Sequence, residues 1–77
     1  MTMLDEMRTE MIAQADAAAG DDAKLFAMEA YCNRYTRQPA KDYTGPKMKA
    51  DANGVKHEVP QSLFVEIEQY VRALRAK

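Results

Sequence analysis

The dipeptide Asn53-Gly54 constrains the fold of this chain more than any other feature. Both residue types tolerate the positive φ angles of a type I′ turn, so the dipeptide predicts a two-residue loop between strands within about residues 47–59. A turn here fixes the register and sets these residues opposite one another: Ala52 and Val55, Asp51 and Lys56, Ala50 and His57, Lys49 and Glu58, Met48 and Val59. Two of the pairs join opposite charges, each worth about 0.2–1 kcal/mol, which favours this register.

Three segments carry apolar residues at the three- and four-residue steps of an amphipathic helix, and we expect helices over about residues 3–19, 22–37 and 61–75. Thr2, with an acid three residues later, predicts a capping box for the first helix, and Asp21 offers an N-cap to the second. The predicted apolar stripes are Leu4, Met7, Met11, Ala15 and Ala18, then Leu25, Met28, Cys32 and Tyr35, and last Leu63, Ile67, Tyr70 and Leu74.

These elements give residues 1–77 the order α-α-β-β-α, a small single domain of the α+β class. A short link at Gly20 predicts that the first two helices form an antiparallel helical hairpin. The type I′ β-hairpin and a C-terminal helix complete the domain. On that last helix, Glu68 and Arg72 are spaced for an i,i+4 ion pair on the solvent side.

The size of the chain suggests that it needs a partner. A domain of 77 residues hides only roughly 60 % of its unfolded surface, so its core alone is marginal. One cysteine, Cys32, and one histidine, His57, provide neither an internal disulfide nor a structural zinc site. A homodimer or a complex with another protein would bury more surface, and Phe26 and Val65, which lie off the predicted stripes, are candidates for a dimer contact.

The sequence offers little of the chemistry that enzymes need, and we expect no catalytic activity, no cofactor and no metal. Ser62 and His57 would have to touch each other and a third orienting group to act as nucleophile and base. The predicted register instead puts His57 on the apolar side of the hairpin. Cys32 lies on a buried stripe, where a thiol is normally inert.

A basic and aromatic segment, residues 31–49, is the first candidate binding surface. Its predicted partner-binding residues are Arg34, Arg37, Lys41, Tyr43 and Lys47. Such side chains neutralise phosphates and stack on unpaired bases, and they suit an acidic protein surface equally well. Arginines in the last turn of a helix also offset its dipole without any ligand.

The first helix offers a second, acidic candidate surface, with Asp5, Glu6 and Glu10 as its predicted partner-binding residues. These acids leave the apolar stripe clear and present negative charge to a basic partner. Proteins that block nucleic-acid-binding enzymes often occupy the phosphate groove in this way. A solvated helix with no binding role would show the same pattern.

The strand, Asn-Gly turn, strand and helix that end the chain resemble the small αββα head–tail joining proteins of phages, although the extra helix before the loop departs from that pattern. Mainly by elimination, we expect a non-catalytic protein-binding module of phage or mobile-element type, an inhibitor or modulator that docks on a larger host protein or complex. The alternatives are a nucleic-acid-binding protein that uses residues 31–49, and a small structural subunit of a phage particle. No segment approaches the ~20 apolar residues of a membrane span, no export signal is seen, and the lone cysteine suits a cytoplasmic protein.

Overall fold

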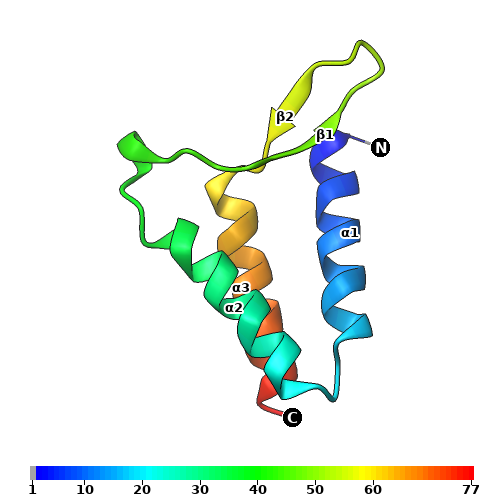
Figure 1. Cartoon of the computed structure of the whole chain (residues 1–77), viewed down its shortest axis with the longest axis vertical. Helices are drawn as coiled ribbons and strands as arrows, with labels where there is room; N and C mark the ends of the chain where they lie inside the picture. The colour runs from blue at the N-terminus through cyan, green and yellow to red at the C-terminus, as the bar shows by residue number, and fades with distance from the viewer. Residues whose placement is uncertain (1) are drawn as a thin grey trace.

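The structure is a computed structural model that describes residues 2–77 and, of residues 48 and 49, the backbone alone. Its elements are, in chain order, α1 (Met3–Ala17), α2 (Asp22–Thr36), a short 3-10 helix η1 (Ala40–Asp42), β1 (Lys47–Ala50), β2 (Lys56–Glu58) and α3 (Gln61–Arg75). The prediction of a small domain with three helices is confirmed, and the domain is mostly helical. Figure 1 shows the helices side by side, with the β-hairpin across one end of them.

Local signals in the sequence start the first two helices as predicted. The Thr2 hydroxyl accepts the N–H of Asp5 at 3.2 Å, and the Asp5 carboxylate accepts the N–H of Thr2 at 3.3 Å, so the capping box is confirmed. The Asp21 carboxylate accepts the N–H of Lys24 at 3.2 Å, which confirms the second N-cap. Between the two helices, Gly20 adopts a φ of +88°, which a residue with a side chain rarely does.

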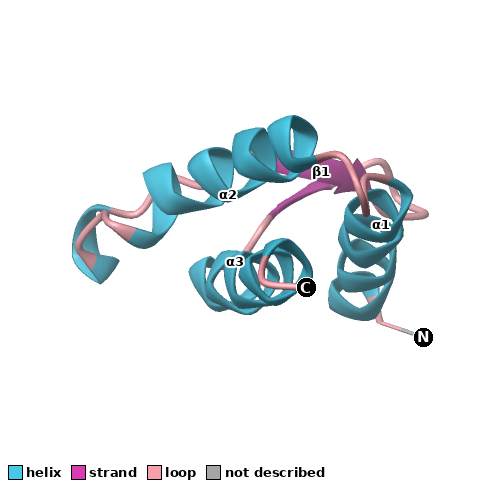
Figure 2. Cartoon of the chain, turned by 90° about the horizontal axis from the view of Figure 1, so that it is seen from below, coloured by secondary structure: helices cyan, strands magenta, loops and turns pink. Residues whose placement is uncertain are grey.

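The third helix is the centre of the packing. α1 and α2 run in opposite directions, as a helical hairpin requires, but both pack against α3 and the larger contact is that of α2. Figure 2 looks along the bundle and shows α2 crossing α3 while α1 stands beside it. The core consists of these buried side chains: Met7, Met11, Ala15, Ala18, Leu25, Cys32, Val59, Leu63, Phe64, Ile67 and Val71. Leu4, predicted for the core, is exposed instead.

The β-hairpin lies where it was predicted, but its register and its turn type were predicted wrongly. β1 and β2 do pair antiparallel, but these residues lie opposite one another: Lys47 and Glu58, Lys49 and His57, Ala50 and Lys56. The register is irregular between residues 47 and 49. The observed pairing is displaced from the predicted one by one residue at His57 and Lys56 and by two residues at Glu58, so neither of the two predicted pairs of opposite charge lies face to face.

Asp51 explains the different register. Its N–H donates to the carbonyl oxygen of Val55 at 2.9 Å, and its own carbonyl oxygen accepts the N–H of Gly54 at 3.0 Å, which closes a three-residue loop. Of these loop residues only Gly54 has a positive φ, +80°, so the type I′ turn at Asn53-Gly54 is not formed. The Asp51 carboxylate accepts the N–H groups of Asn53 and Val55 at 2.9 and 3.0 Å, and such bonds stabilise the wider loop. It also contacts Nε2 of His57 at 2.9 Å, so this histidine lies against Asp51, not over the core as predicted.

Candidate functional site

Apolar residues cover the outer side of α2. We call this surface the α2 face and define it by six exposed residues: Ala23, Phe26, Ala27, Ala30, Tyr31 and Arg34. Their spacing sets them along one side of the helix, away from the buried Leu25 and Cys32. Phe26 is 57 % exposed and Tyr31 is 45 % exposed. Large apolar side chains exposed next to one another on one surface are typical of an interaction site.

Contacts with neighbouring side chains hold both aromatic rings in place at the surface. The guanidinium carbon of Arg75 lies 5.1 Å from the centre of the Phe26 ring, a cation–π contact. Tyr31 meets the rings of Tyr35 and Phe64 edge to face, at centroid distances of 5.4 and 5.9 Å. Because the rings are already positioned, a partner that binds them loses little side-chain entropy.

A groove of about 380 Å³ runs along one edge of the α2 face. Its lining comes from all three helices: Met11 and Gln14 of α1, Ala27, Met28, Tyr31 and Cys32 of α2, and Ile67 of α3. Burial raises the pKa of the Cys32 thiol to about 11, and the carboxylate of Glu68 adds to this shift. The thiol therefore stays protonated near neutral pH, and the groove offers apolar contact surface but no nucleophile.

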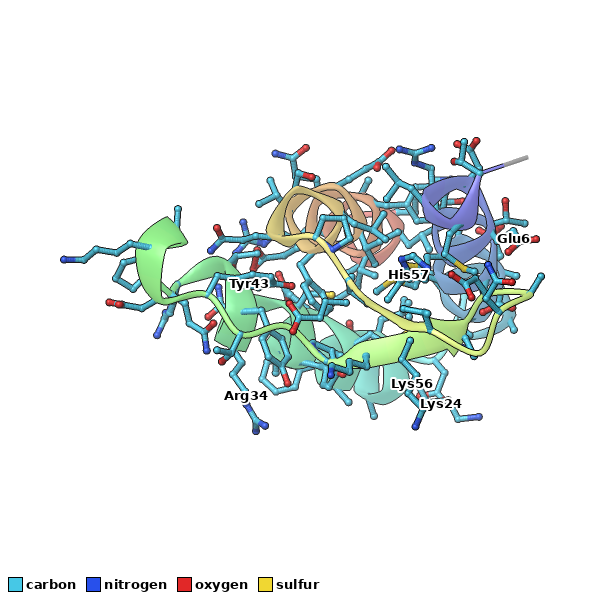
Figure 3. The ribbon with its side chains drawn as sticks, turned by 90° about the horizontal axis from the view of Figure 1, so that it is seen from above. Glu6, Lys24, Arg34, Tyr43, Lys56 and His57 are labelled. Carbon is cyan, nitrogen blue, oxygen red and sulfur yellow. The ribbon has the colours of Figure 1, made fainter. Side chains whose placement is uncertain are left out.

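Opposite charges mark the two ends of α2. Asp21 and Asp22 stand at the N-terminal end, with their side chains 48 % and 71 % exposed, and each pairs within the chain, Asp21 with Lys24 at 3.9 Å and Asp22 with Arg75 at 2.9 Å. Arg34 and Arg37 stand at the C-terminal end and are exposed too. In Figure 3 the side chain of Arg34 extends away from the body of the protein. The α2 face thus has an acidic end, an apolar middle and a basic end.

Polar side chains occupy much of the side of α2 that packs against α3. Glu68 of α3 is 7 % exposed and accepts hydrogen bonds from three side chains: Asn33 (2.8 Å), Thr36 (3.2 Å) and Arg72 (3.3 Å). Glu29 accepts hydrogen bonds from Arg72, at 2.6 Å, and from Arg75, and these bonds lower the pKa of its carboxyl. The prediction that Glu68 and Arg72 form an ion pair is confirmed, but Glu68 does not lie on the solvent side.

The predicted basic residues are distributed over several elements. Arg34 and Arg37 lie together at the end of α2, whereas Lys41 lies in η1 and Lys47 in β1. All four side chains are exposed. The structure therefore brings one of the four, Arg34, onto the α2 face and a second, Arg37, to the end of that helix.

Tyr43, the aromatic member of this predicted set, is an anchor of the loop between α2 and β1. Its hydroxyl donates a hydrogen bond to the carbonyl oxygen of Val59, and its ring meets that of Tyr35 edge to face at 6.4 Å. Gly45 packs against both partners of this bond, because a Cβ at that position would overlap the Tyr43 hydroxyl and the Val59 oxygen. A ring held in this way is half-buried, and its hydroxyl is already engaged within the chain.

The predicted acidic residues form a separate surface on α1. Asp5 is engaged in the capping box and in an ion pair with Arg8 at 3.1 Å; hydrogen bonds, first of all with Thr2, lower the pKa of its carboxyl. Glu6 and Glu10 are half-buried along the same helix. Figure 3 shows Glu6 on the opposite side of the molecule from Arg34, so the acidic and basic candidates do not converge on one site.

Sequence reasoning missed the alanines of the α2 face, although it named Phe26, with Val65 of α3, as a candidate for a dimer contact; both side chains are exposed. The signal was present as a second row, because Ala23, Phe26, Ala27 and Ala30 recur at steps of three, one and three residues. Alanine is common on any helix surface, so this row became informative only once the helix was seen to pack by its other side.

The described residues show no gathered metal ligands, since no three His, Cys, Asp or Glu side chains within residues 2–77 form a group that could hold a metal ion. None of the helices in that range is both long and apolar enough to cross a membrane. Comparison of the chain with protein-family models, with curated proteins and with solved structures finds no match.

Proposed function

We propose that this protein is a non-catalytic protein-binding module whose docking site is the α2 face with its adjacent groove. The observation that carries the proposal is the exposure of Phe26 and Tyr31 on either side of an alanine row. Aromatic side chains that are fixed at a surface and surrounded by small residues are the usual anchors of a protein interface. Arg34 and Arg37 extend this site at its basic end.

The same geometry supports a protein partner over a nucleic acid. Base stacking needs exposed aromatic faces along a basic path. Tyr35 and Phe64 stack on each other at 4.7 Å, and Tyr43 bonds to the backbone, which leaves Tyr31 as the exposed ring of this cluster. Asp21 and Asp22 would also repel a phosphate backbone laid along α2.

The class of protein that the chain binds is a prediction from the sequence alone. A role as an inhibitor or modulator of a larger host protein, an origin in a phage or mobile element and a cytoplasmic location stay predictions. A structural subunit of a particle would use the same kind of apolar docking surface.

Affinity capture with a matched pair of variants tests the proposal. Ala30→Glu puts a charge in the middle of the α2 face, whereas Ala73→Glu makes the same change at an exposed position of α3. Each tagged chain is incubated with lysate of cells that also produce the untagged chain, with and without nuclease. We expect the wild type and Ala73→Glu to retain protein after nuclease treatment, and Ala30→Glu to lose it.

Two outcomes contradict the proposal. If nuclease releases everything that the wild type retains, the chain binds nucleic acid. If Ala30→Glu retains the same proteins as Ala73→Glu, the docking site lies on another surface.

A further inference from the structure

We propose that the partner seated on the α2 face is a second copy of this chain, with the two α2 helices packed antiparallel about a two-fold axis. This inference rests on the proposed function, since it names the occupant of the same site. The axis passes midway between Ala27 and Ala30, the two exposed alanines at the centre of the helix. The contact is then isologous, and every residue of the face meets the same face of the partner.

The charges at the ends of α2 are complementary in this arrangement and in no parallel one. An axis midway between residues 27 and 30 sets Arg34 opposite residue 23 of the second copy and Arg37 opposite residue 20. Both arginines then lie at the end of that copy that carries Asp21 and Asp22, and Asp22, which is 71 % exposed although paired with Arg75, has oxygen surface left to accept a second arginine. The helix dipoles also oppose each other favourably, because each N-terminus lies beside a C-terminus. A parallel pair would instead bring like charges together.

The shape of the face is complementary to itself in the same way. Alanines at the centre let the two helix backbones approach closely, and the bulky rings of Phe26 and Tyr31 flank them on opposite edges. The two-fold axis sets the Tyr31 edge of one copy against the Tyr31 edge of the other, and the Phe26 edge against the Phe26 edge. Each Tyr31 then lies over the groove edge formed by Ala27 and Met28 of the second copy, and each Phe26 lies beside the partner's Ala30.

The polarity of α2 supports burial of this side. Glu29 and Asn33 point toward α3, whereas the aromatic and alanine side chains point outward. A helix with apolar residues on its outer side is normally covered on that side as well. A 15-residue helix is about 22 Å long. One pair of such helices buries less than the roughly 1,600 Å² of a standard interface, so we expect a dimer that dissociates in the micromolar range.

Sedimentation of the purified full chain gives the first test. The wild type should change from monomer to dimer between low micromolar and near-millimolar concentration. Ala30→Glu should raise the dissociation constant at least tenfold, and Ala73→Glu should leave it unchanged. Circular dichroism verifies that each variant is folded.

A charge-swap experiment then tests the antiparallel geometry itself. The double variant Arg34→Glu/Arg37→Glu should be monomeric alone, because its glutamates face Asp21 and Asp22 of the second copy. Asp22→Lys should also be impaired alone, because its lysine faces the arginines. An equimolar mixture of the two should form a heterodimer, since one end contact is then native and in the other the glutamates face a lysine in place of Asp22.

The inference is overturned if the wild type stays monomeric to near-millimolar concentration, if Ala30→Glu dimerises as well as Ala73→Glu, or if the charge-swapped mixture stays monomeric. A monomeric wild type that still captures another protein through the α2 face would refute the inference alone. A chain that neither dimerises nor captures protein would refute the proposed function with it.

Discussion

Replacing Glu68 by glutamine is the sharpest test of how α2 is attached to the domain. The Glu68 carboxylate is 7 % exposed and accepts three hydrogen bonds, from Asn33, Thr36 and Arg72. The substitution keeps the shape of the side chain but removes its charge and turns one acceptor oxygen into a donor. The new NH2 group can face the Thr36 hydroxyl, which accepts from it and donates to the carbonyl oxygen of Asn33 at 3.2 Å, so what is lost is the charge that strengthens the bonds from Asn33 and Arg72.

The expected cost follows from these contacts. A hydrogen bond to a charged group contributes about 1.5–3 kcal/mol, and one to a neutral group about 0.5–1.5 kcal/mol. With the bonds from Asn33 and Arg72 weakened in this way, we expect Glu68→Gln to lower the free energy of unfolding by about 1–3 kcal/mol. A domain of 77 residues has a total of about 4–12 kcal/mol, so the effect is a large fraction of its stability.

Urea unfolding followed by circular dichroism measures this change, and Glu66→Gln is the matched control. Glu66 lies on the same helix and pairs with Arg8 at 2.9 Å, but this pair is exposed and should contribute little. Both substitutions are made in the Ala30→Glu background, so that dimer formation adds nothing to the measured stability. If Glu68→Gln costs no more than Glu66→Gln, the buried network does not hold α2 on α3 and the reasoning fails.

Three further predictions concern single residues. Cys32, with a thiol pKa of about 11, should react with a disulfide reagent at pH 8 roughly a hundredfold more slowly in the folded protein than in urea, and equal rates would refute its burial. Hydrogen bonds, first of all with the imidazole of His57, hold the pKa of Asp51 below its ordinary value of 3.8. The stabilisation by this carboxylate is therefore complete above that value and is lost as the pH falls through the lower, folded-state pKa; an NMR acid titration of the loop amides should show a midpoint below 3.8, and a higher midpoint would contradict the contacts. Gly45→Ala should destabilise the domain by about 1–3 kcal/mol in urea unfolding because the new Cβ overlaps the Tyr43 hydroxyl, and this cost should be reduced in the Tyr43→Phe background; an equal cost in both backgrounds would exclude that contact as the cause.

The helices were predictable because their signals are local. A capping residue, a terminating glycine and a three- and four-residue apolar spacing all act within a few residues of the chain, and Thr2, Gly20 and Asp21 behave as such signals indicate. The apolar stripe of α3 likewise marks the side that enters the core.

The hairpin register was not predictable by the same means, because two good local solutions compete. Asn53-Gly54 favours a two-residue loop, and Asp51 favours a three-residue loop in which its carboxylate accepts two N–H groups. The two predicted charge pairs are not formed, but Lys47 lies opposite Glu58 in the observed register, and exposed pairs of this kind contribute little to the choice between registers. A few tenths of a kcal/mol per contact decide such a choice, and the sequence pattern does not resolve differences of that size.

The usual assumption that apolar side chains point into the core concealed most of the candidate site. α2 reverses this rule in part, because Glu29 and Asn33 serve the α3 interface while Phe26 and three alanines point outward. From sequence, the glutamate and asparagine look solvated and the phenylalanine looks like a stray core residue. Once α3 supplies Glu68, Arg72 and Arg75 as partners, the polar side of α2 is the one already satisfied, and the apolar side is the one still open. α2 is attached through the buried Leu25 and Cys32 together with Glu29 and Asn33, so its exposed aromatic and alanine side remains free to bind, and this is the physical basis for assigning the docking site to α2.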